Sequence, residues 1–181
     1  MSLAQELVAA LGVGRVVGDR GDEHADVPAT DWLPTATAAR DVLGCRWLDF
    51  LGAYEDGRPG VAQTVPVVVA RLYCRERRAG LLLRTAPPPE DPLLPTLTGV
   101  FAGAAWHERE VAEMFGITFT GHPDPRPLLL HGIAGHPLRK SAPLAARAAR
   151  PWPGAVDPDD AGGRRRRRAL LPPGVSEADS R

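Results

Sequence analysis

The chain has 181 residues, 44% of them hydrophobic and 6% aromatic, which is enough for one domain of ordinary size plus a tail. Its 22 basic and 22 acidic side chains give a formal net charge of +0, which argues against nucleic acid or an anionic membrane as the main partner. Its 19 prolines and 19 glycines are unevenly spread, so we expect one compact part and one poorly packed part.

The apolar stretches of the chain are short. The longest of them, residues 65–70 and 99–106, fall far short of the roughly 20 residues that a membrane-spanning helix needs. The N-terminus lacks the basic start and the apolar core of a signal peptide. We therefore expect a soluble protein that reaches a membrane only through another protein.

The first residues predict a short helix followed by two weak strands. Ser2 can cap the helix, whose leucines recur on one face, and Gly12 or Gly14 can end it. The two strands are expected at 13–17 and 25–27, on either side of a charged turn.

The next segment predicts a second helix and then the main sheet. Asp31 can cap a helix that runs to residue 43. The apolar period then changes to the alternation of β-strands, at 46–54, 64–75 and 80–85. Three neighbouring strands after a helix indicate an α+β fold, a two-layer domain with a mostly antiparallel sheet and helices on one face.

The rest of the chain changes character twice. Residues 86–95 are rich in proline and predict an extended linker, after which the most helix-like segment of the chain begins. Beyond Gly121 the sequence is rich in turns, and its final part is of low complexity with a run of arginines at Arg164–Arg168, for which disorder is expected. The predicted division is an α+β domain at 1–120, an extended partner-docking arm at 121–143 and a disordered tail at 144–181.

The two cysteines do not predict a metal or iron–sulfur site. Cys45 and Cys74 are far apart in the sequence, whereas such sites use three or four ligands that lie in close-spaced pairs. We expect both to pack as small hydrophobic residues in strands.

The helix-like segment gathers acids and a base beside Trp106. On a helical wheel Arg109 and Glu113 are four positions apart and can pair. Glu108 and Glu110 point about 160° away from each other, and no nucleophile converges on Glu110 and Glu113. Ion pairing across a protein interface is therefore favoured over enzyme chemistry.

Four polar residues in the turns beyond this helix could ligate a metal on paper. Their spacings match no known zinc pattern, and histidines in turns commonly bond backbone carbonyls. We therefore expect no metal site. The four residues are His122, Asp124, His131 and His136.

One stretch carries a more specific signal. It reads HEREVAEMFGITFTGHPDPRPLLL from His107 to Leu130 and is followed by GHPLRK at Gly135–Lys140. In this order and spacing, the two segments closely resemble the motif of the C-type subunit of NADH-quinone oxidoreductase, the respiratory complex I. One departure is Pro125-Arg126-Pro127, which stiffens the backbone where that family usually has a leucine and two arginines.

The resemblance implies a non-redox structural subunit in the peripheral arm of a proton-pumping enzyme complex, without a catalytic centre or cofactor of its own. NADH, flavin, iron–sulfur clusters and quinone would be bound by other subunits. The implied partners are the B-type and D-type subunits, with the arm docked on the D-type one, which holds the quinone site. The implied location is the cytoplasmic side of the cell membrane, as a peripheral protein. The residues expected at the partner interface are Glu108, Arg109, Glu110, Glu113, Phe115, His122, Asp124, Arg126, His136, Arg139 and Lys140.

Two other functions stay open at this point. Similar domains occur in membrane-bound hydrogenases and in other dehydrogenase complexes built on the same scaffold, and the chain alone does not separate these from the first assignment. The other alternative is a free-standing enzyme that uses the glutamates and histidines of the motif, which turnover by the purified chain would support.

Overall fold

A computed structural model describes residues 1–18, 23–56, 64–130 and 135–142, all of which belong to one compact unit. The predicted tail, including the arginine run, lies outside the described residues. The elements in chain order are α1 (Leu3–Leu11), β1 (Arg15–Val17), β2 (His24–Asp26), the 3-10 turn η1 (Ala29–Asp31), α2 (Trp32–Asp41), β3 (Trp47–Asp56), β4 (Val65–Cys74), β5 (Ala79–Thr85), β6 (Leu93–Pro95), α3 (Ala104–Phe115) and β7 (Thr118–Thr120).

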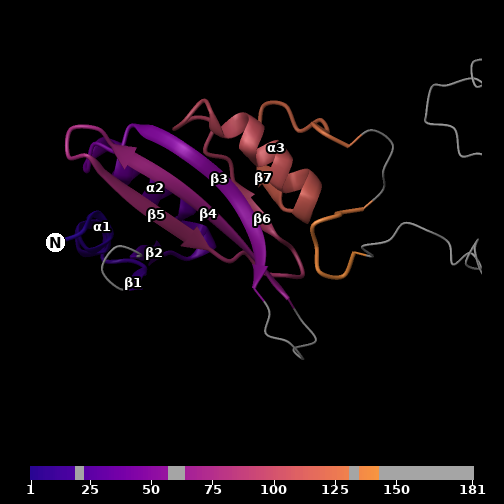
Figure 1. Cartoon of the computed structure of the whole chain (residues 1–181), viewed down its shortest axis with the longest axis horizontal. Coiled ribbons are helices and arrows are strands. Elements are labelled where there is room, and N and C mark those ends of the chain that lie inside the picture. The colour runs from indigo at the N-terminus through magenta and orange to yellow at the C-terminus, as the bar shows by residue number, and fades with distance from the viewer. Residues whose placement is uncertain (19–22, 57–63, 131–134, 143–181) are drawn as a thin grey trace, which may run out of the picture. The chain divides into compact units, whose positions relative to one another are not determined.

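The main sheet has five strands in the order β1-β2-β5-β4-β3 (Figure 1). Neighbouring strands are antiparallel except β2 and β5, which are parallel. The predicted α+β class with a mostly antiparallel sheet is therefore confirmed, and the three strands expected at 46–54, 64–75 and 80–85 correspond to β3, β4 and β5. The parallel pairing was not predicted, because β2 and β5 are far apart in the sequence.

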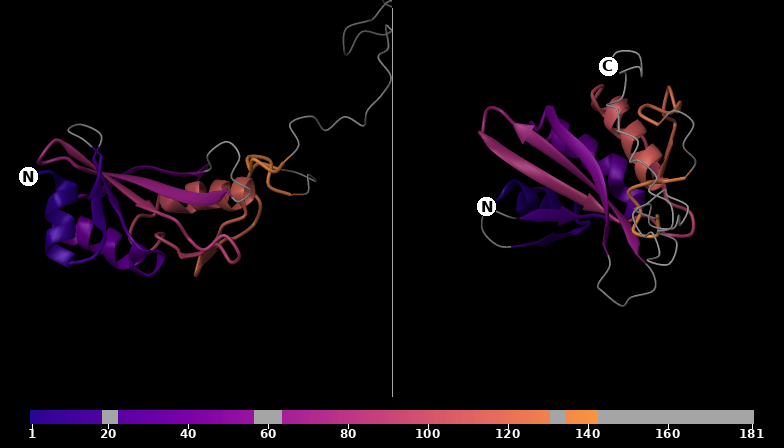
Figure 2. Two further views of the ribbon diagram at one scale, coloured as in Figure 1. Left: turned by 90° about the horizontal axis from the view of Figure 1, so that it is seen from below. Right: turned by 45° about the vertical axis from the view of Figure 1, so that its right-hand side comes forward.

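One face of the sheet carries the core. In β4, Val68, Ala70 and Leu72 are each 0% exposed, whereas Arg71 between them is exposed. This alternation is expected where a sheet packs on one side only. The helices lie on the same side of the sheet, as the left view of Figure 2 shows, and Trp32 of α2 is also 0% exposed.

The two predicted helix caps have different outcomes. Ser2 forms a capping box with Gln5 at the start of α1, and Gly12 ends the helix in the left-handed conformation at φ 65°. Asp31 stands at the N-cap position of α2 as predicted, but the predicted capping bond is wrong, since its side chain accepts no cap hydrogen bond. Asp31 also ends η1, and its φ of −99° and ψ of 2° are not the extended conformation from which a capping side chain reaches the helix.

A second, smaller sheet pairs β6 with β7 in parallel. The proline-rich segment 86–95 was expected to be an extended linker, and its last three residues are in fact β6. Pro95 fits there because it ends a strand in a two-stranded ladder, so its missing N–H interrupts no central pairing. This small sheet fixes the point from which the chain enters α3.

The two cysteines are buried and free. Burial raises the pKa of the Cys45 thiol to about 11, so it is protonated at neutral pH and a poor nucleophile. No helix within the described residues has the length and apolarity that a transmembrane segment needs.

Candidate functional site

The residues that the sequence singled out gather on α3 and on the segment that follows β7. The inner side of α3 is apolar, with Val111, Met114 and Phe115 buried, and it packs against β3. After β7 the chain returns along the helix, and we call its described residues, 121–130 and 135–142, the arm.

Glu108 lies inside the structure, although the sequence placed it at a partner interface. It is 0% exposed. One carboxylate oxygen accepts a hydrogen bond from the backbone N–H of Leu97 at 2.6 Å, and the other accepts one from the hydroxyl of Thr96. Burial raises the pKa of this carboxyl above its ordinary value, against the opposing effect of the two hydrogen bonds. Glu108 thus joins α3 to the turn after β6.

His122 is the first arm residue that contacts α3. Its Nε2 lies 3.0 Å from the carbonyl oxygen of Ala105, to which it can only donate. Its Nδ1 accepts the backbone N–H of Asp124 at 3.0 Å, so the ring is the neutral Nε2–H tautomer. The 3.9 Å approach of Nε2 to Glu108 is therefore not an ion pair between two charged groups.

Arg109 fixes the next part of the arm. Its guanidinium donates to the backbone carbonyls of Arg126 at 2.7 Å and Pro127 at 2.9 Å, and it lies 3.3 Å from the carboxylate of Asp124. Asp124 also accepts two hydrogen bonds from the Arg126 side chain, at 2.6 and 2.8 Å. These hydrogen bonds, with the charge of Arg109, lower the pKa of Asp124 far below its ordinary value, despite a smaller opposing effect of burial.

Glu113 binds three consecutive backbone N–H groups of the arm. Its carboxylate accepts from Leu128 at 3.3 Å, from Leu129 at 2.7 Å and from Leu130 at 2.7 Å. Such charge-assisted bonds are shorter and stronger than those between neutral groups. The sequence indicated that Arg109 and Glu113 can pair along the helix. In the structure, each of them binds backbone groups of the returning arm, which a helical wheel cannot show.

The GHPLRK segment caps the C-terminal end of α3. The last carbonyls of a helix have no partner within it. Here the N–H of Gly116 donates to the carbonyl of Ala112. The carbonyls of Glu113, Met114 and Phe115 accept hydrogen bonds from residues of the arm. Glu113 accepts from His136 Nδ1 at 2.9 Å, Met114 from the N–H of Leu138 at 3.3 Å, and Phe115 from Arg139 Nε at 2.6 Å.

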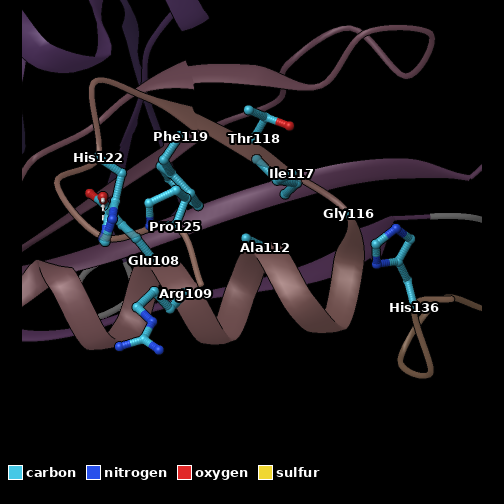
Figure 3. A pocket seen from close by; sticks show the side chains of 10 residues that line it. All are labelled: Glu108, Arg109, Ala112, Gly116, Ile117, Thr118, Phe119, His122, Pro125 and His136. Carbon is cyan, nitrogen blue, oxygen red and sulfur yellow. Dashed lines mark ion pairs between the residues drawn. The ribbon is translucent and has the colours of Figure 1, made fainter. Parts of the chain in front are cut away.

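A cavity of about 270 Å³ lies between α3, β7 and the arm (Figure 3). His122 and Glu108 stand at one end of it and His136 at the other, with Ala112 between them. Gly116 forms the wall beside His136. A Cβ on Gly116 would lie 2.5 Å from His136 Nε2, so the His136 ring would have to shift, and the φ of +73° also favours glycine.

The predicted interface residues therefore fall into two groups. Glu108 and Phe115 are buried within the chain. The side chains of Arg109, Glu113, His122, Asp124 and Arg126, with those of His136 and Arg139, bind other parts of α3 and the arm. Glu110 is exposed, as is Lys140, whose backbone N–H donates to Glu55 of β3 at 2.6 Å. Contact of any of them with a partner stays a prediction.

The sequence missed three residues that matter to this arrangement. Thr96 and Leu97 bind Glu108, and nothing in their local pattern indicates it. Leu129 stands 54% exposed on the arm, and only the run of three leucines within a charged motif hinted at it.

The acids and bases of this arrangement bond backbone groups or one another. Among the described residues that line the cavity, Thr118 carries a hydroxyl, and no serine, cysteine or lysine stands there. Within the described residues, no three His, Cys, Asp or Glu side chains come together as a metal site would need. His131, one of the four considered as ligands, lies outside the described residues.

The sequence has relatives across most of its length. Residues 25–148 match the family described as "Respiratory-chain NADH dehydrogenase, 30 Kd subunit". The chain is 34% identical over 162 residues to the C-type subunit of NADH-quinone oxidoreductase from Bordetella petrii, covering 80% of this chain and 78% of that protein. It is 45% identical over 100 residues to the C/D-type subunit of the same enzyme from Methylococcus capsulatus, covering 55% of this chain but only 16% of that longer protein.

The fold is also found among solved structures. The structure described as "Nqo5 of the trypsin-resistant fragment (1-134) in P63 form" superposes with a TM-score of 0.53 at 28% identity, covering 66% of this chain and 95% of that one. A chain of the membrane-bound sulfane sulfur reductase, an archaeal respiratory membrane complex, superposes with a TM-score of 0.50 at 16% identity, covering 66% and 69%. At that identity the second likeness concerns the fold alone.

Proposed function

The chain belongs to the family of the 30 Kd subunit of respiratory-chain NADH dehydrogenase, and we propose that it serves as the structural, non-redox subunit of the peripheral arm of a proton-pumping NADH-quinone oxidoreductase. The resemblance seen in residues 107–140 is thereby confirmed as family membership, and the relatives are named as subunits of a multi-subunit enzyme. In this proposal NADH, flavin, iron–sulfur clusters and quinone are all bound by other subunits.

The proposed partners are the B-type and D-type subunits, with the arm docked on the D-type one, at the quinone site. The observation that carries this proposal is the binding of the arm backbone by Arg109 and Glu113. These contacts hold an otherwise irregular segment at the surface in one shape, as a docking element needs. The relative from Methylococcus capsulatus adds support, because its name joins the C and D types in one protein. Attachment to the cytoplasmic side of the membrane would follow through these partners.

The first test is co-purification. The full-length chain, tagged in its native host and isolated from detergent-solubilised membranes, should bring down the B-type and D-type subunits in equal amounts. The same tag on an unrelated cytoplasmic protein is the control. Recovery of the chain as a lone monomer, while the quinone reductase assembles without it, would overturn the proposal.

The second test separates a structural role from a catalytic one. Deleting the gene should abolish NADH-dependent quinone reduction in membranes, because the complex does not assemble. The purified chain alone should oxidise no NADH and show no flavin or iron–sulfur absorbance. Turnover by the purified chain would instead support the free-standing enzyme.

A related hydrogenase or other dehydrogenase complex is the alternative assignment. The fold also occurs in the archaeal sulfane sulfur reductase complex, but there only the fold is shared. The co-purified proteins separate the two assignments, since flavin-binding subunits indicate NADH as the donor and a nickel-ligating subunit indicates hydrogen.

A further inference from the structure

The three leucines of the arm are not equivalent. Leu128 and Leu130 are partly buried, and Leu130 packs against the core, whereas Leu129 between them is 54% exposed. Their backbone N–H groups all donate to Glu113. The side chain of Leu129 is thus exposed to solvent, on a backbone that hydrogen bonds to Glu113 hold in place.

The loop formed by residues 126–130 is held along its length by two side chains of α3. Arg109 binds the carbonyls of Arg126 and Pro127, and Glu113 binds the next three N–H groups, so five consecutive residues are fixed by two helix side chains. None of these contacts needs a second protein. The loop therefore has its shape before a partner arrives, which lowers the ordering cost of binding.

Two more large apolar side chains are exposed next to this loop. Trp106 is 69% exposed. It precedes Glu113 by seven positions, which is about two turns of α3, so the two residues lie on the same side of the helix. Leu138 is 57% exposed, and its backbone is bonded to the last turn of α3. Exposed apolar side chains on a rigid frame are typical of interface anchors.

We infer that Leu129 is the anchor with which this chain docks, inserted into an apolar pocket of the D-type subunit, and that Glu113 is the positioning residue that holds the anchor. The inference rests on the proposed function. A folded protein fits better than a lipid surface, because a fixed backbone complements a fixed pocket but brings no advantage in a fluid bilayer.

The test measures the affinity of the full-length chain for the D-type subunit of the same organism, purified with its B-type neighbour. Leu129→Asp should weaken binding about 30-fold or more, as for other central anchors. Leu129→Met, which keeps an apolar side chain of similar volume, should stay within about threefold. Val42→Asp, at a residue 70% exposed beyond α2, is the matched control and should leave the affinity unchanged.

The role of Glu113 is tested in the free chain. Glu113→Gln should speed hydrogen exchange at the amides of Leu128, Leu129 and Leu130, while the amides of the main sheet keep their protection. Glu110→Gln, at an exposed position on the same helix, should leave all of these rates unchanged. Unchanged exchange in Glu113→Gln would remove Glu113 from the inference.

The outcomes separate the inference from the function beneath it. A wild-type chain that binds no D-type subunit overturns both. A wild-type chain that binds, with Leu129→Asp binding as tightly, overturns the inference alone. Flotation of wild type but not Leu129→Asp with vesicles of phosphatidylglycerol and phosphatidylethanolamine would assign the leucine to a membrane and likewise overturn it.

Discussion

Around the five-stranded sheet the interior is mainly apolar, and side chains such as Trp32, Leu72 and Leu83 are each 0% exposed. Around α3 the interior also holds a carboxylate, Glu108, and the arm is fixed by charged side chains that bind backbone groups. The sheet region thus draws its stability from burial, which is nondirectional, whereas the α3–arm region depends on a few directed bonds. The sequence predicted ion pairing across a protein interface for the charged motif, and in the structure much of the motif binds other parts of the same chain.

The largest effect should come from the sheet region. Trp32→Ala removes a fully buried indole and should lower the free energy of unfolding by about 3–5 kcal/mol, because the cavity it leaves refills only partly. Urea unfolding followed by far-UV circular dichroism measures this. A loss confined to the arm, with the sheet unaffected, would contradict the division between the two regions.

Glu108→Ala should be the most damaging change in the α3–arm region. It leaves the N–H of Leu97 and the hydroxyl of Thr96 without their acceptor in a buried place, and should cost about 2–3 kcal/mol. The same unfolding experiment measures it, with Glu110→Ala as the exposed control on the same helix. An equal and small effect of both changes would mean that the interior carboxylate is not a structural bond.

A pair of glycines allows the cost of backbone strain to be measured separately from the cost of a steric clash. Gly12 and Gly116 both end helices in the left-handed conformation, at φ 65° and 73°. A Cβ on Gly12 meets nothing within 4 Å, whereas one on Gly116 meets His136. Gly12→Ala should therefore cost about 1 kcal/mol of strain and Gly116→Ala about 1 kcal/mol more. Thermal unfolding gives the difference, and equal costs would show that His136 yields freely.

The smallest effect is a dependence on pH. Burial raises the pKa of Glu108 above its ordinary value of 4.5, so the folded chain holds this proton more tightly than the unfolded chain. The stability it contributes is present below pH 4.5 and is lost as pH rises through the folded pKa. Glu108→Gln removes the titration, so its stability relative to wild type should increase from pH 4.5 upward. Parallel profiles of wild type and variant would contradict this.

Local patterns were enough to predict most of the elements. Alternation identified β3, β4 and β5, and Ser2 as a helix cap marked the start of α1. What the sequence could not show were contacts between distant residues. The pairing of β6 with β7 and the bond from Leu97 to Glu108 depend on where the chain returns, not on any local period.

The same limit applies to the candidate site. The motif singled out α3 and the arm, and its residues were predicted to contact a partner. Arg109 and Glu113 point to backbone groups more than ten positions further along the chain, and no helical wheel includes these groups. Sequence patterns indicate which residues carry a function, while the structure shows that several of them act by shaping the surface.

The parallel ladder between β2 and β5 has a consequence for how the protein is made. Its partners, such as Asp26 and Arg84, are separated by 58 positions, so a nascent chain exposes β1 and β2 well before their neighbour has left the ribosome. Closing so long a loop is slow compared with forming the hairpins of the same sheet. Truncated products that stop before Ala79 lack β5, which packs against α1 and pairs with β2. Leu3 and Ala25, which are buried in the whole chain, would then be exposed, so such fragments should be bound by chaperones or degraded by proteases.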